Sequence, residues 1–260
     1  PPARAHAAID ERRALAAIIF TSGSTGMPRG VTLTHQNLIA NTRSILEYLE
    51  LGSGDRVMVV LPFYYSFGAS LLHTHLAAGA TLGIDRRFMF PDRVLERMIE
   101  TRCTGFAGVP SHYQILLRRS KLASLRFPDL RWLQQAGGKL APVFIEELVR
   151  TLPDARLYVM YGATEATARI SYLPPARLVD KLGSVGRAIP GVTLSVRDGS
   201  DREVAPGEVG EIAVQGDNVA QGYWRCPEES AASFRNGRFY TGDLATVDAL
   251  GQAVRSLEWT

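Results

Sequence analysis

Short apolar runs alternate with helix-like patterns through the first two thirds of the chain. Apolar runs bounded by turn residues predict strands, and the run at 15–20 predicts a buried strand that ends at a loop rich in glycine and hydroxyl side chains. The predicted strands are 15–20, 56–61, 81–84, 104–107, 131–134 and 157–160. Strands that alternate with helices indicate an α/β fold, in which a mostly parallel sheet is covered by helices on both faces.

Apolar residues at helical spacing predict the elements between these strands. Thr34 is a candidate N-cap, and Leu38, Ile45 and Leu49 recur after it on one helical face. Pro91 suits the first turn of another helix. The remaining helices are predicted at 66–78, 111–119 and 143–151.

The pattern changes near Pro174 and Pro175. From Gly183 onward, strands predicted at 192–197 and 211–215 are separated by turn sequences. This change predicts a smaller β-rich subdomain after the α/β part. We therefore divide the chain into an α/β nucleotide- and acyl-binding subdomain at 1–177 and a β-rich subdomain at 178–260.

Composition narrows the class of protein. The 260 residues are 46% hydrophobic and 21% charged, as in ordinary soluble globular proteins. The net charge of +3 is spread along the chain, so we predict no nucleic-acid partner despite a pI near 9.0. No apolar stretch reaches the roughly 18 residues of a membrane span, and the first residues do not resemble a signal peptide. Cys103 and Cys226 lack disulfide or metal-site spacing, so we expect reduced thiols in a cytoplasmic protein.

The loop at 21–30 is the strongest candidate for chemistry. Hydroxyl side chains and glycines precede Arg29 in it: Thr21, Ser22, Gly23, Ser24, Thr25 and Gly26. Small residues let backbone N–H groups approach an anion closely, the hydroxyls add donors, and Arg29 adds positive charge. The loop therefore predicts a polyphosphate site. It lacks the Gly-Lys-Ser/Thr ending of a Walker loop, and a flexible surface loop is the alternative interpretation.

Two further motifs favour a nucleotide. Residues 161–165 directly follow the predicted strand 157–160, at the end of a strand where α/β sheets bind ligands. There Tyr161 could stack on a base, and Glu165 could hold Mg²⁺ between phosphates. Asp243 follows a Thr-Gly turn and can accept hydrogen bonds from ribose hydroxyls. Taken singly, an ordinary strand exit and a simple turn would explain both motifs.

In this order, the three motifs resemble those of the adenylate-forming enzymes: acyl- and aryl-CoA synthetases, adenylation domains of peptide synthetases, and firefly-type luciferases. Residues 21–30 match the family sequence Thr-Ser-Gly-Ser-Thr-Gly-x-Pro-Lys-Gly, except that Arg29 replaces the lysine. Other blocks of the family follow in order at 61–68, 108–110, 137–138, 210–216 and 222–229. The resemblance spans about residues 14 to 251.

The resemblance implies a two-step reaction. A small-molecule carboxylic acid attacks the α-phosphate of ATP, which gives an acyl-adenylate and pyrophosphate. Coenzyme A, or the phosphopantetheine of an acyl carrier protein, then takes the acyl group. The implied site comprises residues 21–26 and Arg29 for the phosphates, Thr164 for the α-phosphate, Glu165 for Mg²⁺, Gly137, Gly138, Tyr161 and Gly162 around adenine, Asp243 for ribose, and Tyr64, Tyr65 and Gly68 for the acid.

The chain departs from the family pattern in three respects. Arg29 keeps the charge of the usual lysine but is planar and forked. Tyr65 stands where many acyl-CoA synthetases have histidine. The family's N-terminal portion and its C-terminal lid domain, with its catalytic lysine, have no counterpart in the 260 residues. We therefore expect a fragment with little adenylating activity of its own.

The block at 61–68, which the resemblance assigns to the acyl site (the acyl block), favours an acyl-CoA synthetase over a peptide-synthetase domain. Tyr64 and Tyr65 occupy this block, and the aspartate with which amino-acid adenylation domains hold an amino group is absent. An amino-acid adenylation domain and a nucleotide-binding fragment without catalysis are the alternatives.

Overall fold

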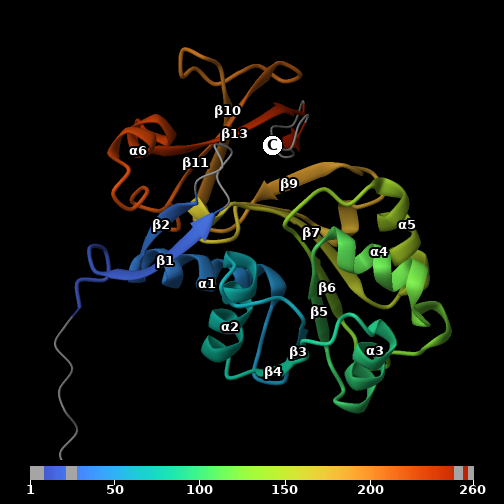
Figure 1. Ribbon diagram of the computed structural model, residues 1–260. Coiled ribbons are helices and arrows are strands. Elements are labelled where there is room, and N and C mark those ends of the chain that lie inside the picture. The colour runs from blue at the N-terminus through green and yellow to red at the C-terminus, as the bar shows by residue number, and fades with distance from the viewer. Residues whose placement is uncertain (1–8, 22–27, 249–253, 257–260) are drawn as a thin grey trace, which may run out of the picture.

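The computed structural model describes residues 9–21, 28–248 and 254–256 (Figure 1). Parallel strands form one end of a 12-stranded sheet. They lie in the spatial order β4 (Thr81–Ile84), β3 (Arg56–Val59), β5 (Gly105–Gly108), β6 (Trp132–Gln135) and β7 (Arg156–Tyr161). All five were predicted from their apolar runs. The α/β class with a mostly parallel sheet is thereby confirmed.

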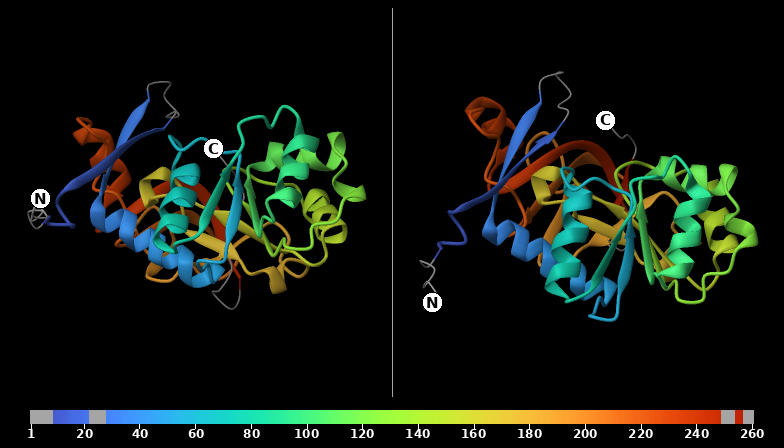
Figure 2. Two further views of the ribbon diagram at one scale, coloured as in Figure 1. Left: turned by 90° about the horizontal axis from the view of Figure 1, so that it is seen from below. Right: turned by 60° about the horizontal axis from the view of Figure 1, so that its bottom comes forward.

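Helices cover both faces of these strands (Figures 1 and 2). One face packs against α1 (His35–Leu49) and α2 (Ser66–Ala77), and the other packs against α3 (Pro91–Glu100), α4 (Pro110–Arg119) and α5 (Pro142–Thr151). Successive residues of a strand alternate between the two cores because side chains in a strand alternate between its faces. Short 3₁₀ turns add η1 (Leu122–Ser124), η2 (Thr164–Ala166) and η3 (Pro175–Arg177).

Local capping explains where these helices begin. The Thr34 hydroxyl accepts a hydrogen bond from the Asn37 amide, and the Asn37 side chain accepts one from the Thr34 amide. This reciprocal capping box satisfies backbone donors that the first turn would leave unpaired, and it confirms Thr34 as an N-cap. The three helices on the other face, α3, α4 and α5, each begin with proline, as predicted for α3 at Pro91.

Antiparallel strands extend the same sheet beyond β7. They are β8 (Ser171–Leu173), β9 (Ser184–Ala188), β10 (Val192–Arg197), β11 (Val209–Gly216), β12 (Phe234–Arg235), β13 (Arg238–Val247) and β14 (Val254–Ser256), with α6 (Pro227–Ser233) before β12. Strand β9 pairs with β8 on one side and with β14 on the other. The smaller β-rich region is confirmed. The boundary between two subdomains at 177/178 stays a prediction. Strand β9 is hydrogen-bonded to β8 on one side and to β14 on the other, so the sheet continues across this boundary.

The strand predicted at 15–20 is present, but its predicted burial is wrong. Strand β1 (Leu15–Thr21) pairs only with β2 (Arg29–Thr34) in the described part of the chain, in a separate antiparallel ribbon (Figure 1). Leu15 and Phe20 are 45% and 62% exposed. An apolar run alone cannot distinguish a strand buried inside a sheet from a strand of a two-stranded ribbon that is covered on one face only.

Two smaller sequence predictions concern membranes and cysteines. None of the helices in the described ranges has the length and apolar character needed to cross a membrane. Cys103 is buried and Cys226 is half-buried, and neither forms a disulfide.

Candidate functional site

A cleft of about 570 Å³ lies where β7 ends, beside the β1–β2 ribbon and β13. Its volume falls within the range of small-molecule sites, about 300–1,000 Å³. It is lined by Thr21, Arg29, Tyr161, Ala163, Glu165, Glu211, Tyr223, Ala232, Ser233, Arg235, Phe239, Tyr240, Thr241, Gly242 and Asp243. Members of all three sequence motifs therefore meet in one cleft, although they are far apart along the chain.

Tyr161 and Asp243 join the second motif to the third. Tyr161 is the last residue of β7 and is 2% exposed, and its hydroxyl donates a hydrogen bond of 2.5 Å to Oδ2 of Asp243. Burial, followed by the negative charge of Asp243, raises the pKa of Tyr161 well above its usual value. The phenol therefore stays protonated and keeps one carboxylate oxygen of Asp243 in place. A role for Tyr161 beside an adenine ring stays a prediction.

Asp243 lies on a bulged strand and not in a turn between strands. Residues 238–247 form the single strand β13, and its pairing with β11 shifts register between Glu211 and Ala213. At the shift Gly242 has a φ of +82°, a conformation that favours glycine. The Gly242 amide donates to Oε1 of Glu211 at 2.9 Å. The bulge is the physical reason why this Thr-Gly pair looked like a turn in the sequence.

Glu165 faces the cleft from η2. Its Oε1 accepts a hydrogen bond of 2.9 Å from the Tyr223 hydroxyl. Burial, with a contribution from the charge of Glu165, raises the pKa of Tyr223 to about 12, so Tyr223 remains a donor. The guanidinium of Arg29 lies over the Tyr223 ring, 5.4 Å from its centroid. Tyr223 thus orders both Glu165 and Arg29 at the wall of the cleft.

A single carboxylate at this position fits a magnesium ion held mainly by a nucleotide. Mg²⁺ in such sites takes one or two carboxylates, phosphate oxygens and water molecules. Glu211, the other lining glutamate, is committed to the Gly242 amide and to Arg235 at 3.2 Å. No group of three or more metal-ligating side chains is found in the described ranges, so a cage built by protein alone is not seen there.

The phosphate loop begins and ends at the rim of the cleft. Thr21 and Arg29 are paired across the β1–β2 ribbon, and both line the cleft. The other predicted phosphate ligands, Ser22, Gly23, Ser24, Thr25 and Gly26, lie outside the described residues. Their roles stay predictions.

Thr164 and Gly162 are held by close contacts after β7. The Thr164 hydroxyl donates to the Ser66 hydroxyl at 3.2 Å, which connects this loop to the start of α2. A Cβ atom at Gly162 would lie 1.9 Å from the backbone oxygen of Ala168, so only glycine fits. The loop that carries Thr164 and Glu165 is thus folded tightly back on itself.

The predicted acyl residues lie outside the 570 Å³ cleft but at the same edge of the sheet. Tyr64 and Tyr65 follow β3, are 71% and 57% exposed, and have ring centroids 4.6 Å apart. Gly68 on α2 is pressed against the backbone oxygen of Pro62. Strand β3 runs parallel to β7, and the loops after parallel strands share one edge of the sheet.

The glycine pair follows β6 at this same edge. Gly137 packs against Val109 and Gly138 against Pro110, where α4 begins. The Gln135 side chain donates to the Gly138 backbone oxygen at 2.8 Å and holds the turn. Neither glycine lines the 570 Å³ cleft, and a role beside adenine or the acid stays a prediction.

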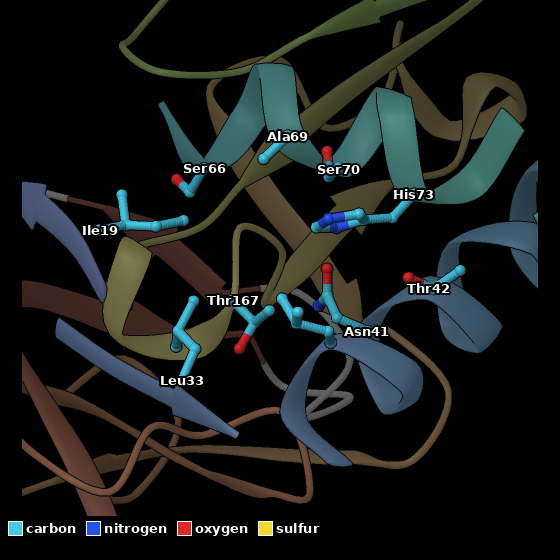
Figure 3. Close-up of a pocket in the computed structure, with 10 residues that line it drawn as sticks. Ile19, Leu33, Asn41, Thr42, Ser66, Ala69, Ser70, His73 and Thr167 are labelled. Carbon is cyan, nitrogen blue, oxygen red and sulfur yellow. The ribbon is translucent and has the colours of Figure 1, made fainter. Parts of the chain in front are cut away.

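A second, much smaller cavity of about 10 Å³ lies between α1 and α2 (Figure 3). Figure 3 shows His73 of α2 directed toward Asn41 of α1, with Ser66 at the other end of the cavity. This volume accommodates about one water molecule and no substrate. His75 points elsewhere, and its ring lies 6.0 Å from that of Trp132.

Sequence reasoning missed two polar residues that organise the site. Tyr223 binds Glu165, and Ser66 binds Thr164. Both lie within blocks that resemble the family, at 222–229 and 61–68, but nothing local in the sequence links them to their partners. Only the three-dimensional structure reveals that these two residues contact Glu165 and Thr164.

Comparisons with known proteins identify the family of this chain. The model of the family described as "AMP-binding enzyme" matches residues 2–224. A feruloyl-CoA synthase of an Amycolatopsis species is 38% identical over 239 residues, which is 90% of this chain and 47% of that protein. An indoleacetate–CoA ligase of Aromatoleum aromaticum is 32% identical over 90% of this chain and 46% of its own length.

Solved structures show the same fold. The o-succinylbenzoate CoA synthetase of Bacillus subtilis, in complex with ATP and magnesium, superposes with a TM-score of 0.86 at 28% identity. That match covers 94% of this chain and 50% of the synthetase. The chain spans about half the length of the curated relatives it matches. By its matched residues and its fold, the chain belongs to the AMP-binding enzyme family.

Proposed function

We propose that this chain is the nucleotide- and acyl-binding part of an acyl-CoA ligase. Such an enzyme activates a carboxylic acid with ATP as an acyl-adenylate and transfers the acyl group to coenzyme A. The observation that carries the proposal is the convergence of Arg29, Glu165 and Asp243 on one cleft, beside the carboxyl edge of the parallel strands. This convergence supports phosphate, metal and ribose roles for the three residues, next to loops that can hold an acid.

Each proposed ligand has a task that follows from its chemistry. Asp243, oriented by Tyr161, accepts hydrogen bonds from the ribose hydroxyls. Arg29 and the N–H groups of the loop at 21–26 neutralise the β- and γ-phosphates, and Thr164 donates to the α-phosphate. When bound, Mg²⁺ at Glu165 lowers the charge repulsion that opposes attack on the α-phosphate. Neutralising this charge before the reaction is the main contribution such a site can make.

The relatives support coenzyme A as the acceptor. Their names describe ligases that form CoA esters of ferulate, indoleacetate, oxalate and 2-succinylbenzoate. A related synthetase has been solved with its acyl-adenylate intermediate, which supports the same two-step order here. Transfer to a carrier-protein pantetheine is the variant that we place second. The cytoplasm is the proposed compartment.

Nucleotide binding by the 260-residue chain tests the proposal. Isothermal titration with AMP and with ATP·Mg²⁺ should give saturable binding at one site. Glu165→Gln should weaken ATP·Mg²⁺ about tenfold, because it removes the metal's carboxylate, and should leave metal-free AMP unchanged. Asp243→Asn should weaken both ligands, because both carry the ribose.

Glu146→Gln is the matched control, since Glu146 is exposed on α5, away from the cleft. The control should bind both ligands as the unchanged chain does. Equal loss of AMP and ATP·Mg²⁺ in Glu165→Gln, or wild-type binding in Asp243→Asn, would contradict the assignment. Catalysis is then tested with hydroxylamine trapping of acyl-adenylates.

A further inference from the structure

Arg169 is a fully buried arginine without a carboxylate partner. It has no exposed surface, although it lies only a few residues after η2. None of the ion pairs in the described part of the chain includes it. Burial lowers the pKa of Arg169, but from an ordinary value so high that the side chain stays charged. An uncompensated buried charge is costly, so its retention calls for an explanation.

Among the described residues, the groups that contact the guanidinium are neutral. Nε donates to the Met160 sulfur at 3.3 Å, and Nη2 donates to Oε1 of Gln134 at 3.2 Å. The guanidinium carbon lies 4.1 Å from the centroid of the Phe67 ring. The Tyr48 phenol also interacts with the guanidinium through its side chain, but burial raises the pKa of its hydroxyl to about 12, so it carries no negative charge. A thioether, an amide, a ring face and a phenol offer only weak compensation.

Two donors at this place have no hydrogen-bond partner in the described part of the chain. They are Nη1 of Arg169 and Nε2 of Gln134. The orientation of the Gln134 amide is fixed, because only its oxygen can accept from Arg169. Its nitrogen must then point to something else. Two unpaired donors on touching side chains require an acceptor, and a carboxylate has oxygens for both.

The position of this donor pair relates it to the acid. Gln134 lies near the end of β6, Met160 near the end of β7, and Phe67 on α2 within the acyl block at 61–68. The pair thus lies at the core between the sheet and α2, in contact with Met160 and Phe67. Phe67 packs on the guanidinium and follows the exposed Tyr65 by two residues along the chain.

We propose that Arg169 and Gln134 bind a second carboxylate at the far end of the acid, so that the substrate is a dicarboxylic acid. This inference rests on the proposed function. Because Arg169 has no exposed surface, the far end of the acid reaches it past the Phe67 ring, which turns aside. One carboxylate is left at the α-phosphate for activation, and the other pairs with the buried charge. The alternative occupant of the same two donors is a buried water molecule.

The test uses stable mimics of the acyl-adenylate on the 260-residue chain. Acyl-sulfamoyl-adenosines of increasing acyl length are compared in matched pairs that end in methyl or in carboxylate. For at least one length, the carboxylate member should bind more than about tenfold tighter, since an unpaired buried donor discriminates strongly against a ligand without an acceptor. Arg169→Met and Gln134→Leu should each reduce this preference, and Arg169→Lys should retain part of it. AMP affinity should not change in any variant.

Thermal unfolding separates a binding role from a structural one. Replacing an uncompensated buried charge by methionine should leave the melting temperature unchanged or raise it. Arg156→Met, at an exposed arginine of β7, is the control for loss of charge alone and should keep the carboxylate preference. If Arg169→Met does not fold, Gln134→Leu and Arg169→Lys still carry the test.

The outcomes are distinct. Absence of AMP binding to the unchanged chain would contradict the proposed function itself. Normal AMP binding without a carboxylate preference at any length would mean a buried water only and would overturn the inference. A preference that persists in Arg169→Met would also overturn it, because the second carboxylate would then bind elsewhere.

Discussion

Removing one hydroxyl group, in Tyr161→Phe, tests how Asp243, the proposed ribose ligand, is held. The substitution leaves the buried ring in place and deletes the hydrogen bond of 2.5 Å to Asp243. A hydrogen bond to a charged acceptor stabilises by roughly 1.5–3 kcal/mol. Asp243 is only half-buried, so water can replace part of this interaction, and we expect about 1 kcal/mol.

AMP affinity is the informative measurement. Without the phenol, the Asp243 carboxylate loses one of the contacts that orient it, and this part of its order must be restored when ribose binds. A cost of about 1 to 1.4 kcal/mol corresponds to roughly five- to tenfold weaker AMP binding, measured by isothermal titration. The stability of the chain in urea should fall by a similar amount, about 1 kcal/mol.

Tyr113→Phe provides the matched control for this variant. Tyr113 is fully buried, and its hydroxyl donates to the Gln134 backbone oxygen at 2.7 Å, within the α3–α5 core. Its removal should also cost about 1 kcal/mol of stability, with AMP affinity unchanged. A folded Tyr161→Phe chain that binds AMP like the unchanged chain would refute the view that Tyr161 orients a ribose ligand.

Two further predictions concern the tight turn after β7 and acid stability. Gly162→Ala should lower the free energy of unfolding, measured in urea, by at least about 2 kcal/mol, because its Cβ would meet the Ala168 backbone. Gly52→Ala, at an open position, is the control and should lower it by less than about 1 kcal/mol. Equal losses in the two variants would contradict the close contact at Gly162. The Arg87 hydrogen bonds hold the pKa of Asp85 at about 2, below its ordinary 3.8. The ionised Asp85 therefore stabilises the folded chain above about pH 4, and this contribution is lost as the pH falls toward 2. With Arg87 55% exposed, Asp85→Asn should lose about 1 kcal/mol near pH 6 and nothing near pH 2, and a loss independent of pH would count against this ion pair.

The sequence predicts the α/β framework because its signals are local. Buried parallel strands appear as apolar runs, and helices begin at capping residues such as Thr34 and Pro91, so both element types are found close to their true bounds. The strand at 15–20 shows where this reasoning stops. Its apolar residues are half-exposed because its pairing partner, β2, forms a ribbon with it away from the main sheet.

The site was predicted in its parts but not in its connections. Asp243 and Tyr161 are separated by 82 residues, and their hydrogen bond depends on the bulge of β13. Tyr223 is separated from Glu165 by 58 residues. Arg169 looked like any other arginine, because neither its complete burial nor its neutral surroundings can be read from nearby residues. Such contacts depend on the tertiary fold, which local patterns do not encode.

Strand β9 has a consequence for the order in which the protein folds. Its partner on one side, β8, precedes it closely in the chain, whereas its partner on the other side, β14, is made about 70 residues later. Contacts of such long sequence separation form slowly, because the intervening chain must first be ordered. During synthesis the parallel strands can therefore assemble while one edge of β9 remains unpaired. That edge stays open to other strands, including those of a second nascent chain, until residues 254–256 have been made.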